Sequence, residues 1–131
     1  MLPGDWIEHR RADDRELLGW IRPIDGDWVP VDRLGRTLTS PVDWLDAEAT
    51  LDARGLRWLS DLWQLALDDG TVARVRLAEV SPDRVVVVED VFGAAVAGAR
   101  TWTLPFPAPG TLREFQGDPH VLDGPAGPGR S

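Results

Sequence analysis

The chain has 131 residues and a net charge of −8, with 43% apolar and 27% charged residues. These values are typical of one soluble globular domain, and 22 acidic residues against 14 basic ones argue against sequence-independent binding to nucleic acid. The chain has no cysteine, which excludes disulfides, thiolate nucleophiles and cysteine zinc sites.

The first predicted element is a β-hairpin. Residues 17–24 lead into Asp25 and Gly26, and residues 28–34 return. Because Asp followed by Gly supplies the positive φ angles of a tight turn, this pair predicts the bend. Pro30 has no N–H to donate to a ladder, so the returning strand is expected at a sheet edge.

The same segment holds three aspartates, Asp25, Asp27 and Asp32, as a cation-binding loop does. A calcium loop of the common kind has acids at its first, third and fifth positions, glycine at the sixth and a closing glutamate. Here glycine comes second and no such glutamate follows. The segment therefore predicts a turn and no metal site.

A helix is predicted next, between Ser40, which is a typical N-cap before proline, and Gly55. Its apolar stripe is irregular, because Trp44 and Leu51 point away from the stripe that Val42, Leu45, Ala49 and Ala53 form. Two alternatives stay open: a helix from Ser40 that is covered on two sides, or an extended segment at 42–45 followed by a helix. We adopt a helix over residues 46–54.

The clearest pattern is a three-stranded meander over residues 61–91. Apolar and polar residues alternate on both sides of an Asp-Gly pair at 69–70, which predicts a hairpin. The sequence Ser-Pro-Asp at 81–83 forms the next turn, and the four valines at 85–88 suit a strand buried on both faces.

The other segments carry weaker patterns. Residues 56–59 are expected to run extended into the meander, and the alternation at 101–106 predicts a last strand. Threonine and glutamate in capping-box spacing predict a short helix over 111–117. The Gly- and Pro-rich residues 118–131 are expected to be a flexible tail behind a single compact β-rich domain over residues 1–117.

The two predicted hairpins raise the question of internal duplication. Asp25 and Asp69 are 44 residues apart, and the same offset pairs Trp58 with Trp102. A true duplication would give the fold an approximate two-fold symmetry. A chain rich in the matching residue types also yields such pairs by chance, so the duplication stays open.

Candidates for catalysis are few. Neither His9 nor His120 has a second histidine at the spacing of a metal site, and Glu8 is expected to face away from His9 on a strand. The serines are not in a glycine-flanked nucleophile elbow. They are Ser40, Ser60 and Ser81. We therefore predict no catalytic residue, no metal ligand and no cofactor.

Acidic residues and glycines at the ends of the predicted strands have ordinary explanations. Asp68, Asp69, Glu89 and Asp90 are expected to be solvated turn residues. The segment FGAAVAG at 92–98 follows a strand, but it lacks the lysine and the glycine spacing of a phosphate-binding loop. We therefore predict a plain loop there.

The unusual feature of the composition is its seven tryptophans. Most are expected in the core, but Trp28 stands on the predicted edge strand, on the side opposite its valines. We expect Trp20 and Trp28 to meet across the first hairpin in an exposed aromatic patch rimmed by Asp25 and Asp27. This patch is the candidate surface for a ligand or partner.

Four segments are similar to short uncharacterised proteins of high-GC actinobacteria, over residues from about 5 to 115. They are GDWVPVDRLGR, LDARGL, EVSPDRVVVVED and WTLPFPAPGTLR. The resemblance implies a complete, small, cytoplasmic bacterial protein. It implies no activity, cofactor or catalytic residue.

The sequence also lacks a leader pattern at its start and the roughly 18 consecutive apolar residues that cross a bilayer. We expect a cytoplasmic α+β protein, mostly β, with two hairpins plus a central strand in an antiparallel sheet or partly open barrel, and one central helix. The function expected first is a non-enzymatic binding or interaction module that joins a protein partner, or a second copy through the Trp28 edge. The alternatives are a small enzyme using carboxylates and His9 in a cleft of the sheet, and a component of a larger assembly without a site of its own.

Overall fold

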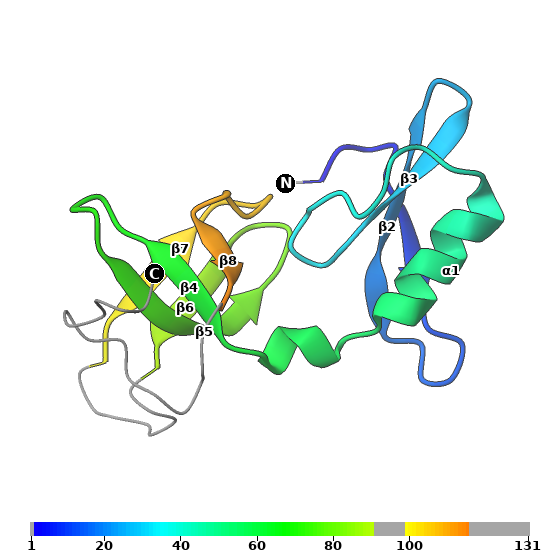
Figure 1. Ribbon diagram of the computed structural model, residues 1–131. Coiled ribbons are helices and arrows are strands. Elements are labelled where there is room, and N and C mark those ends of the chain that lie inside the picture. The colour runs from blue at the N-terminus through cyan, green and yellow to red at the C-terminus, as the bar shows by residue number, and fades with distance from the viewer. Residues whose placement is uncertain (1, 91–98, 116–131) are drawn as a thin grey trace.

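The computed structural model describes residues 2–90 and 99–115, and these form two open antiparallel sheets, one α-helix and one 3-10 helix (Figure 1). The small sheet has the order β1-β2-β3 and the large sheet the order β7-β6-β5-β4-β8. The elements are β1 Ile7–Arg10, β2 Leu17–Ile24, β3 Asp27–Val31, α1 Trp44–Arg54, η1 Arg57–Ser60, β4 Trp63–Ala66, β5 Val72–Val80, β6 Val85–Glu89, β7 Thr101–Leu104 and β8 Leu112–Glu114. The predicted mostly β class with one main helix is confirmed, and neither sheet closes into a barrel.

The first hairpin forms as predicted. Asp25 and Gly26 have φ angles of 50° and 87°, and they join β2 to β3. β3 is the outer strand of the small sheet, as Pro30 indicated. Its outer edge is nevertheless covered, because Trp28 exchanges two 2.8 Å backbone hydrogen bonds with Val42, and the N–H of Leu38 donates to the carbonyl of Pro30 at 2.9 Å. The expected free edge beside Trp28, through which a second copy was to pair, is therefore not present.

The helix begins later than its sequence start signal. The N-cap is Asp43, whose carboxylate accepts a hydrogen bond from the N–H of Asp46 at 2.8 Å, and not Ser40. The reason is the bridge between Trp28 and Val42, which holds the backbone extended up to the cap. The structure lies between the two alternatives, because Val42 is extended but Trp44 and Leu45 are already helical, and α1 is two residues longer than the predicted span of 46–54. The predicted stripe is wrong, since the helix buries Ala47 and Leu51 and exposes Leu45.

Both faces of the small sheet are covered. On one face, Ala47 and Leu51 of α1 pack against Leu18 and Ile21. The other face carries an aromatic cluster, which consists of Trp20, Val29, Val31 and Phe106, with Trp6 packed against it. Figure 1 shows α1 on the side of the small sheet that faces away from the large sheet.

The large sheet confirms the predicted meander and the last strand, but it corrects two neighbouring segments. Residues 57–60 form η1 and not an extended lead, and Trp58 of this turn donates its indole N–H to the carbonyl of Gly55 at 3.0 Å. The predicted helix after Thr111 is wrong where it is described. Leu112 starts β8, pairs with Leu65 of β4 and is fully buried, so a distant strand overrides the local capping pattern.

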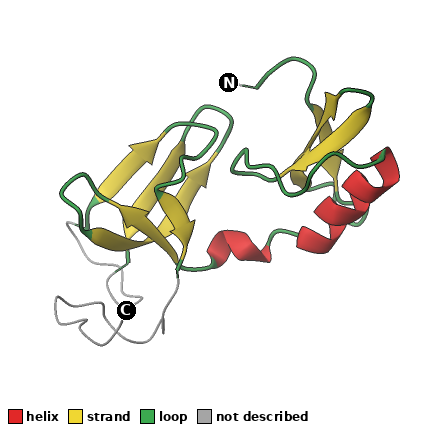
Figure 2. Ribbon diagram, turned by 45° about the horizontal axis from the view of Figure 1, so that its top comes forward, coloured by secondary structure: helices red, strands yellow, loops and turns green. Residues whose placement is uncertain are grey.

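The two halves exchange side chains where they meet. Leu34, from the loop after β3, belongs to the core of the large sheet, whereas Phe106, from the loop after β7, belongs to the aromatic cluster of the small sheet. The N–H of Ala108 donates to the carbonyl of Leu34 at 2.9 Å. A Cβ on Gly35 would lie 2.8 Å from Pro107, so this close approach requires glycine. Figure 2 shows the two groups of strands joined by the helical segment.

Some predictions concern parts of the chain outside the described residues, namely the loop at 92–98, His120 and the tail at 118–131. The duplication finds support only in the hairpins, because the offset of 44 residues pairs Trp58 in η1 with Trp102 in β7. No helix within residues 2–90 and 99–115 combines the length and apolar character needed to cross a membrane.

Candidate functional site

The predicted pair of Trp20 and Trp28 does not form a patch. Trp28 stands opposite Pro23 in the ladder, three residues from Trp20, and an odd separation places two side chains on opposite faces of a strand. Trp20 is 1% exposed, and its ring centroid lies 6.0 Å from that of Trp6 and 5.7 Å from that of Phe106. This tryptophan belongs to the core and is not available to a partner.

Trp28 instead meets a tryptophan that the sequence pattern did not pair with it. The rings of Trp28 and Trp44 pack edge to face with a centroid distance of 4.9 Å and an interplanar angle of 83°. Both side chains are half-buried against the cluster under α1. Leu45, the next residue of the helix, is 73% exposed. We call Trp28, Trp44 and Leu45 together the tryptophan surface.

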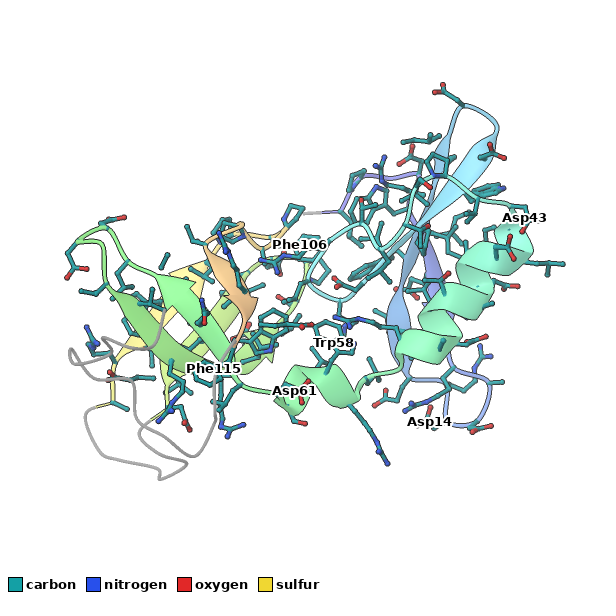
Figure 3. The ribbon with its side chains drawn as sticks, in the orientation of Figure 1. Asp14, Asp43, Trp58, Asp61, Phe106 and Phe115 are labelled. Atoms are coloured by element: carbon teal, nitrogen blue, oxygen red, sulfur yellow. The ribbon has the colours of Figure 1, made fainter. Side chains whose placement is uncertain are left out.

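The tryptophan surface is assembled from the tip of the first hairpin and the first turn of α1. The bridge to Val42 fixes Trp28 beside the start of the helix, and the Asp43 cap fixes the helix start. Figure 3 shows Asp43 at the end of α1 that is farther from the 3-10 turn carrying Trp58. The surface therefore lies at the outer end of the small sheet.

Exposed carboxylates lie close to the tryptophan surface in the chain. Asp25 stands in the hairpin turn beyond Trp28, and Asp43 and Asp46 flank the sequence Trp44-Leu45. Asp27 precedes Trp28 in β3 and pairs with Ile24, so its side chain lies on the opposite face of the hairpin from Trp28. All four aspartates are exposed. The prediction that Asp25 and Asp27 rim an aromatic surface stays a prediction for Asp25, with Trp44 in the place expected for Trp20, whereas the ladder places Asp27 on the other face.

The three aspartates of the first hairpin do not converge on one point. Asp25 and Asp27 are exposed at the tip, whereas Asp32 is 3% exposed at the far end of β3. Its Oδ1 accepts hydrogen bonds from the N–H groups of Leu34 at 2.9 Å and Arg36 at 3.1 Å. The segment is a turn followed by a buried structural carboxylate, as opposed to a cation loop.

Burial raises the pKa of Asp32 above its usual value, against the effect of its two backbone hydrogen bonds and of the nearby arginines. Arg54 of α1 places its Nη2 3.9 Å from Oδ2, and its guanidinium lies 4.4 Å from the ring centroid of Trp58. Asp32 therefore fixes the loop whose Leu34 and Arg36 contact the other half. Nothing in the sequence distinguished it from the exposed Asp25 and Asp27.

His9 contacts two carboxylates of α1. Its Nε2 lies 2.9 Å from Oδ1 of Asp52, and its Nδ1 lies 3.5 Å from Oε2 of Glu48. Glu8 pairs instead with Arg10 at 3.1 Å, so the two neighbours do separate as predicted. Because the carboxylates engage opposite ring nitrogens, this arrangement holds strand β1 to the helix.

Two of the serines considered as nucleophiles donate their hydroxyl groups to backbone carbonyls and not to His9. The hydroxyl of Ser60 donates to the carbonyl of Arg57, and that of Ser81 donates to the carbonyl of Arg84. Within residues 2–90 and 99–115, no three histidines or carboxylates group in a way that would hold a metal ion.

One of the acids expected in solvated turns is buried. The side chain of Asp90 is 5% exposed and lies 3.5 Å from Nε of Arg74 and 3.1 Å from Nε of Arg76. A backbone hydrogen bond brings the carboxylate to these arginines of β5, because the N–H of Asp90 donates to the carbonyl of Arg74 at 2.8 Å. Asp68 and Asp69 are exposed, as expected.

Comparison of the chain with models of protein families, with curated proteins and with solved structures finds no match. A function for the chain therefore has to be inferred from the chemistry of its own residues.

Proposed function

We propose that the protein is a non-enzymatic binding module that holds a protein partner on the tryptophan surface. The observation that carries this proposal is the 73% exposure of Leu45 beside the half-buried pair of Trp28 and Trp44. An apolar side chain exposed to this degree contributes nothing to the core. Aromatic side chains held in such a surface are the residues that most often supply the binding energy of an interface.

The rigidity of the surface supports the same function. Trp28 is fixed by two hydrogen bonds to Val42 and by packing against Trp44, and the helix start is fixed by its Asp43 cap. Binding to side chains that are already ordered loses less conformational entropy than binding to mobile ones. The surface is thus prepared for contact in the free protein.

A separate partner fits this surface better than a second copy. Pairing of two copies through β3 has no free backbone groups beside Trp28, because Val42 and Leu38 occupy them. Contact between two tryptophan surfaces would also bring like charges together, since Asp25, Asp43 and Asp46 lie beside each of them. The chain has no cysteine and therefore needs no oxidising compartment, and we propose that the binding takes place in the cytoplasm.

The alternative of a small enzyme that uses His9 has weaker support. Both ring nitrogens of His9 face carboxylates of α1, which leaves neither of them directed at a substrate. The side chain is 14% exposed and lies between a strand and the helix. These contacts favour a structural role.

The proposal is tested by selecting binders from a phage library of random peptides against the full chain. Leu45→Asp places a charge in the surface and suits the first turn of a helix, where acidic residues are stabilising. Val72→Asp is the matched control, because Val72 is 52% exposed on the large sheet. We expect selected peptides that lose binding to the Leu45 variant and keep it with the Val72 variant. A selection that yields no binders, or binders that ignore Leu45→Asp, would contradict the proposal.

A further inference from the structure

We infer that the partner of the tryptophan surface is a basic amphipathic segment, a helix whose apolar face covers Trp28, Trp44 and Leu45 and whose arginine or lysine side chains reach the nearby aspartates. This inference rests on the proposed function and names the chemistry of the partner. Three structural observations carry it, namely the charge near the surface, the lack of an arginine over its tryptophan rings among the described residues, and the occupied edge of β3.

The charge around the surface is not neutralised within the described residues near it. Arg22, Arg33 and Arg36 are the basic residues between the start of β2 and Arg54 at the end of α1. Arg22 pairs with Val29 in the ladder, so its side chain lies on the face of the hairpin opposite Trp28. Arg33 donates to the carbonyl of Leu17, and Arg36 donates to carbonyl groups of Ala108, Pro109 and Leu112 in the other half. The exposed aspartates at the hairpin tip and helix start therefore attract a cationic partner.

The tryptophans of the surface differ from others in the same protein. Arginine guanidinium groups lie 4.4 Å from the ring centroid of Trp58 and 5.0 Å from that of Trp102. Among the residues that the structure describes, no arginine lies over the ring of Trp28 or of Trp44. A guanidinium or ammonium group is attracted to the face of an indole ring, so these rings offer a partner the cation contact that the protein's own arginines make elsewhere.

The occupied edge of β3 limits how the partner binds. Trp28 and Pro30 have already used their outward backbone groups, so an extended peptide cannot add as a further strand beside them. The partner has to contact side chains, and an amphipathic helix presents apolar residues at i, i+3 and i+4 to such a surface. The aspartates also disfavour an anionic membrane or a nucleic acid, which carry the same sign of charge.

The test uses three labelled 14-residue helical peptides with the same leucine face, in which the polar positions are all Arg, all Gln or all Glu. Fluorescence anisotropy measures their binding to the full chain at low and at physiological salt. We expect the Arg peptide to bind at least roughly tenfold more tightly than the Gln peptide and the Glu peptide not to bind. The affinity of the Arg peptide should fall as salt is added, because salt screens exposed charges.

Two variants separate this inference from the proposed function. Asp46→Asn, in the first turn of α1 beside Leu45, should weaken the Arg peptide several-fold and leave the Gln peptide unchanged, whereas Asp68→Asn, in the exposed turn of the other hairpin, should change neither. Leu45→Asp should weaken both peptides. Equal binding of the Arg and Gln peptides, both sensitive to Leu45→Asp, would overturn the basic partner and leave the binding surface standing. Binding of the Arg peptide that ignores Leu45→Asp would overturn the surface itself, and failure of all three peptides to bind would overturn the inference.

Discussion

The two halves of the molecule reach a buried core by different routes. The described strands of the large sheet share one apolar cluster around Trp63, Val75 and Val87. The small sheet has only three strands and divides its apolar residues between two faces, one under α1 and one around Trp20. A sheet of this size needs cover from other elements to be stable. The comparison shows that the small sheet is complete only with a side chain supplied by the large one.

The largest effect is expected from removing the side chain that the large half supplies to the small sheet. Phe106 contributes to the aromatic cluster of the small sheet although it follows β7 of the large sheet. We expect Phe106→Ala to lower the free energy of unfolding by about 3–5 kcal/mol, because it empties a buried aromatic site. Urea denaturation gives the loss, and hydrogen exchange of the β2 and β3 amides shows where it falls.

Leu104→Ala is the control for this variant, since Leu104 is a half-buried residue of β7 that packs on the large sheet's own cluster. We expect a smaller loss and unchanged exchange in β2 and β3. If Phe106→Ala left the amides of the small sheet as protected as in the wild type, the dependence of one half on the other would be wrong.

The next largest effect is expected at Asp32, which holds the loop that carries Leu34 and Arg36 to the other half. Asp32→Ala removes the acceptor of two backbone hydrogen bonds and should cost about 2 kcal/mol. Asp32→Asn keeps an oxygen that accepts both bonds and removes the buried charge, so we expect it to stay close to the wild type in thermal denaturation. An equal loss in both variants would show that the charge, and not the hydrogen bonds, is what matters.

The pH dependence of stability provides a second comparison of the wild type with Asp32→Asn. Since the folded-state pKa of Asp32 is raised above its usual value of 3.8, the folded protein holds this proton more tightly than the unfolded chain does. Stability is therefore lost as the pH rises from the unfolded to the folded pKa. The stability of the wild type relative to Asp32→Asn should fall over that interval and then stay level. A difference that rises with pH would contradict the raised pKa.

A smaller effect is expected where β1 is held to α1. His9→Ala removes the contacts with Glu48 and Asp52 and should cost about 1 kcal/mol, the usual net value of a hydrogen bond. Glu8→Ala is the matched control on the opposite face of the strand, where an exposed ion pair contributes little. Chemical denaturation of the two variants measures the difference, and equal stabilities would mean that His9 does not hold the helix.

The smallest effect on stability is expected at the tryptophan surface. Leu45→Asp should change the melting temperature by less than the error of the measurement, because the side chain is 73% exposed. This result would set Leu45 apart from residues that the fold requires. A clear destabilisation would instead make Leu45 part of the core and weaken the case for a binding role.

The sequence predicted the features that depend on neighbours along the chain. The turns at Asp25-Gly26 and Asp69-Gly70 and the meander after Leu62 follow from local geometry and alternation, and they are confirmed. Features decided by distant contacts were missed. Leu112 has helical capping residues around it, but pairing with β4 makes it a strand.

The candidate site could be predicted only in part, for the same reason. Exposed aspartates at the hairpin tip were foreseen from the turn, but the partner of Trp28 depends on strand register and on where the helix begins. The bridge to Val42 sets both, and it joins residues 14 positions apart through a single contact that leaves no periodic pattern. Asp32 and Asp90 were likewise indistinguishable from exposed turn residues until the fold surrounded them.

The position of Phe106 also has a consequence for the order in which the protein is made. The ribosome releases the small sheet and α1 well before it releases residue 106. One face of that sheet therefore lacks its Phe106 cover while a large part of the chain is still being synthesised. The nascent first half exposes Trp20 and Val31 during this interval, and both are apolar residues that attract chaperones and other chains. Release of the loop after β7 ends the interval, so completion of the fold coincides with the arrival of its last described strands.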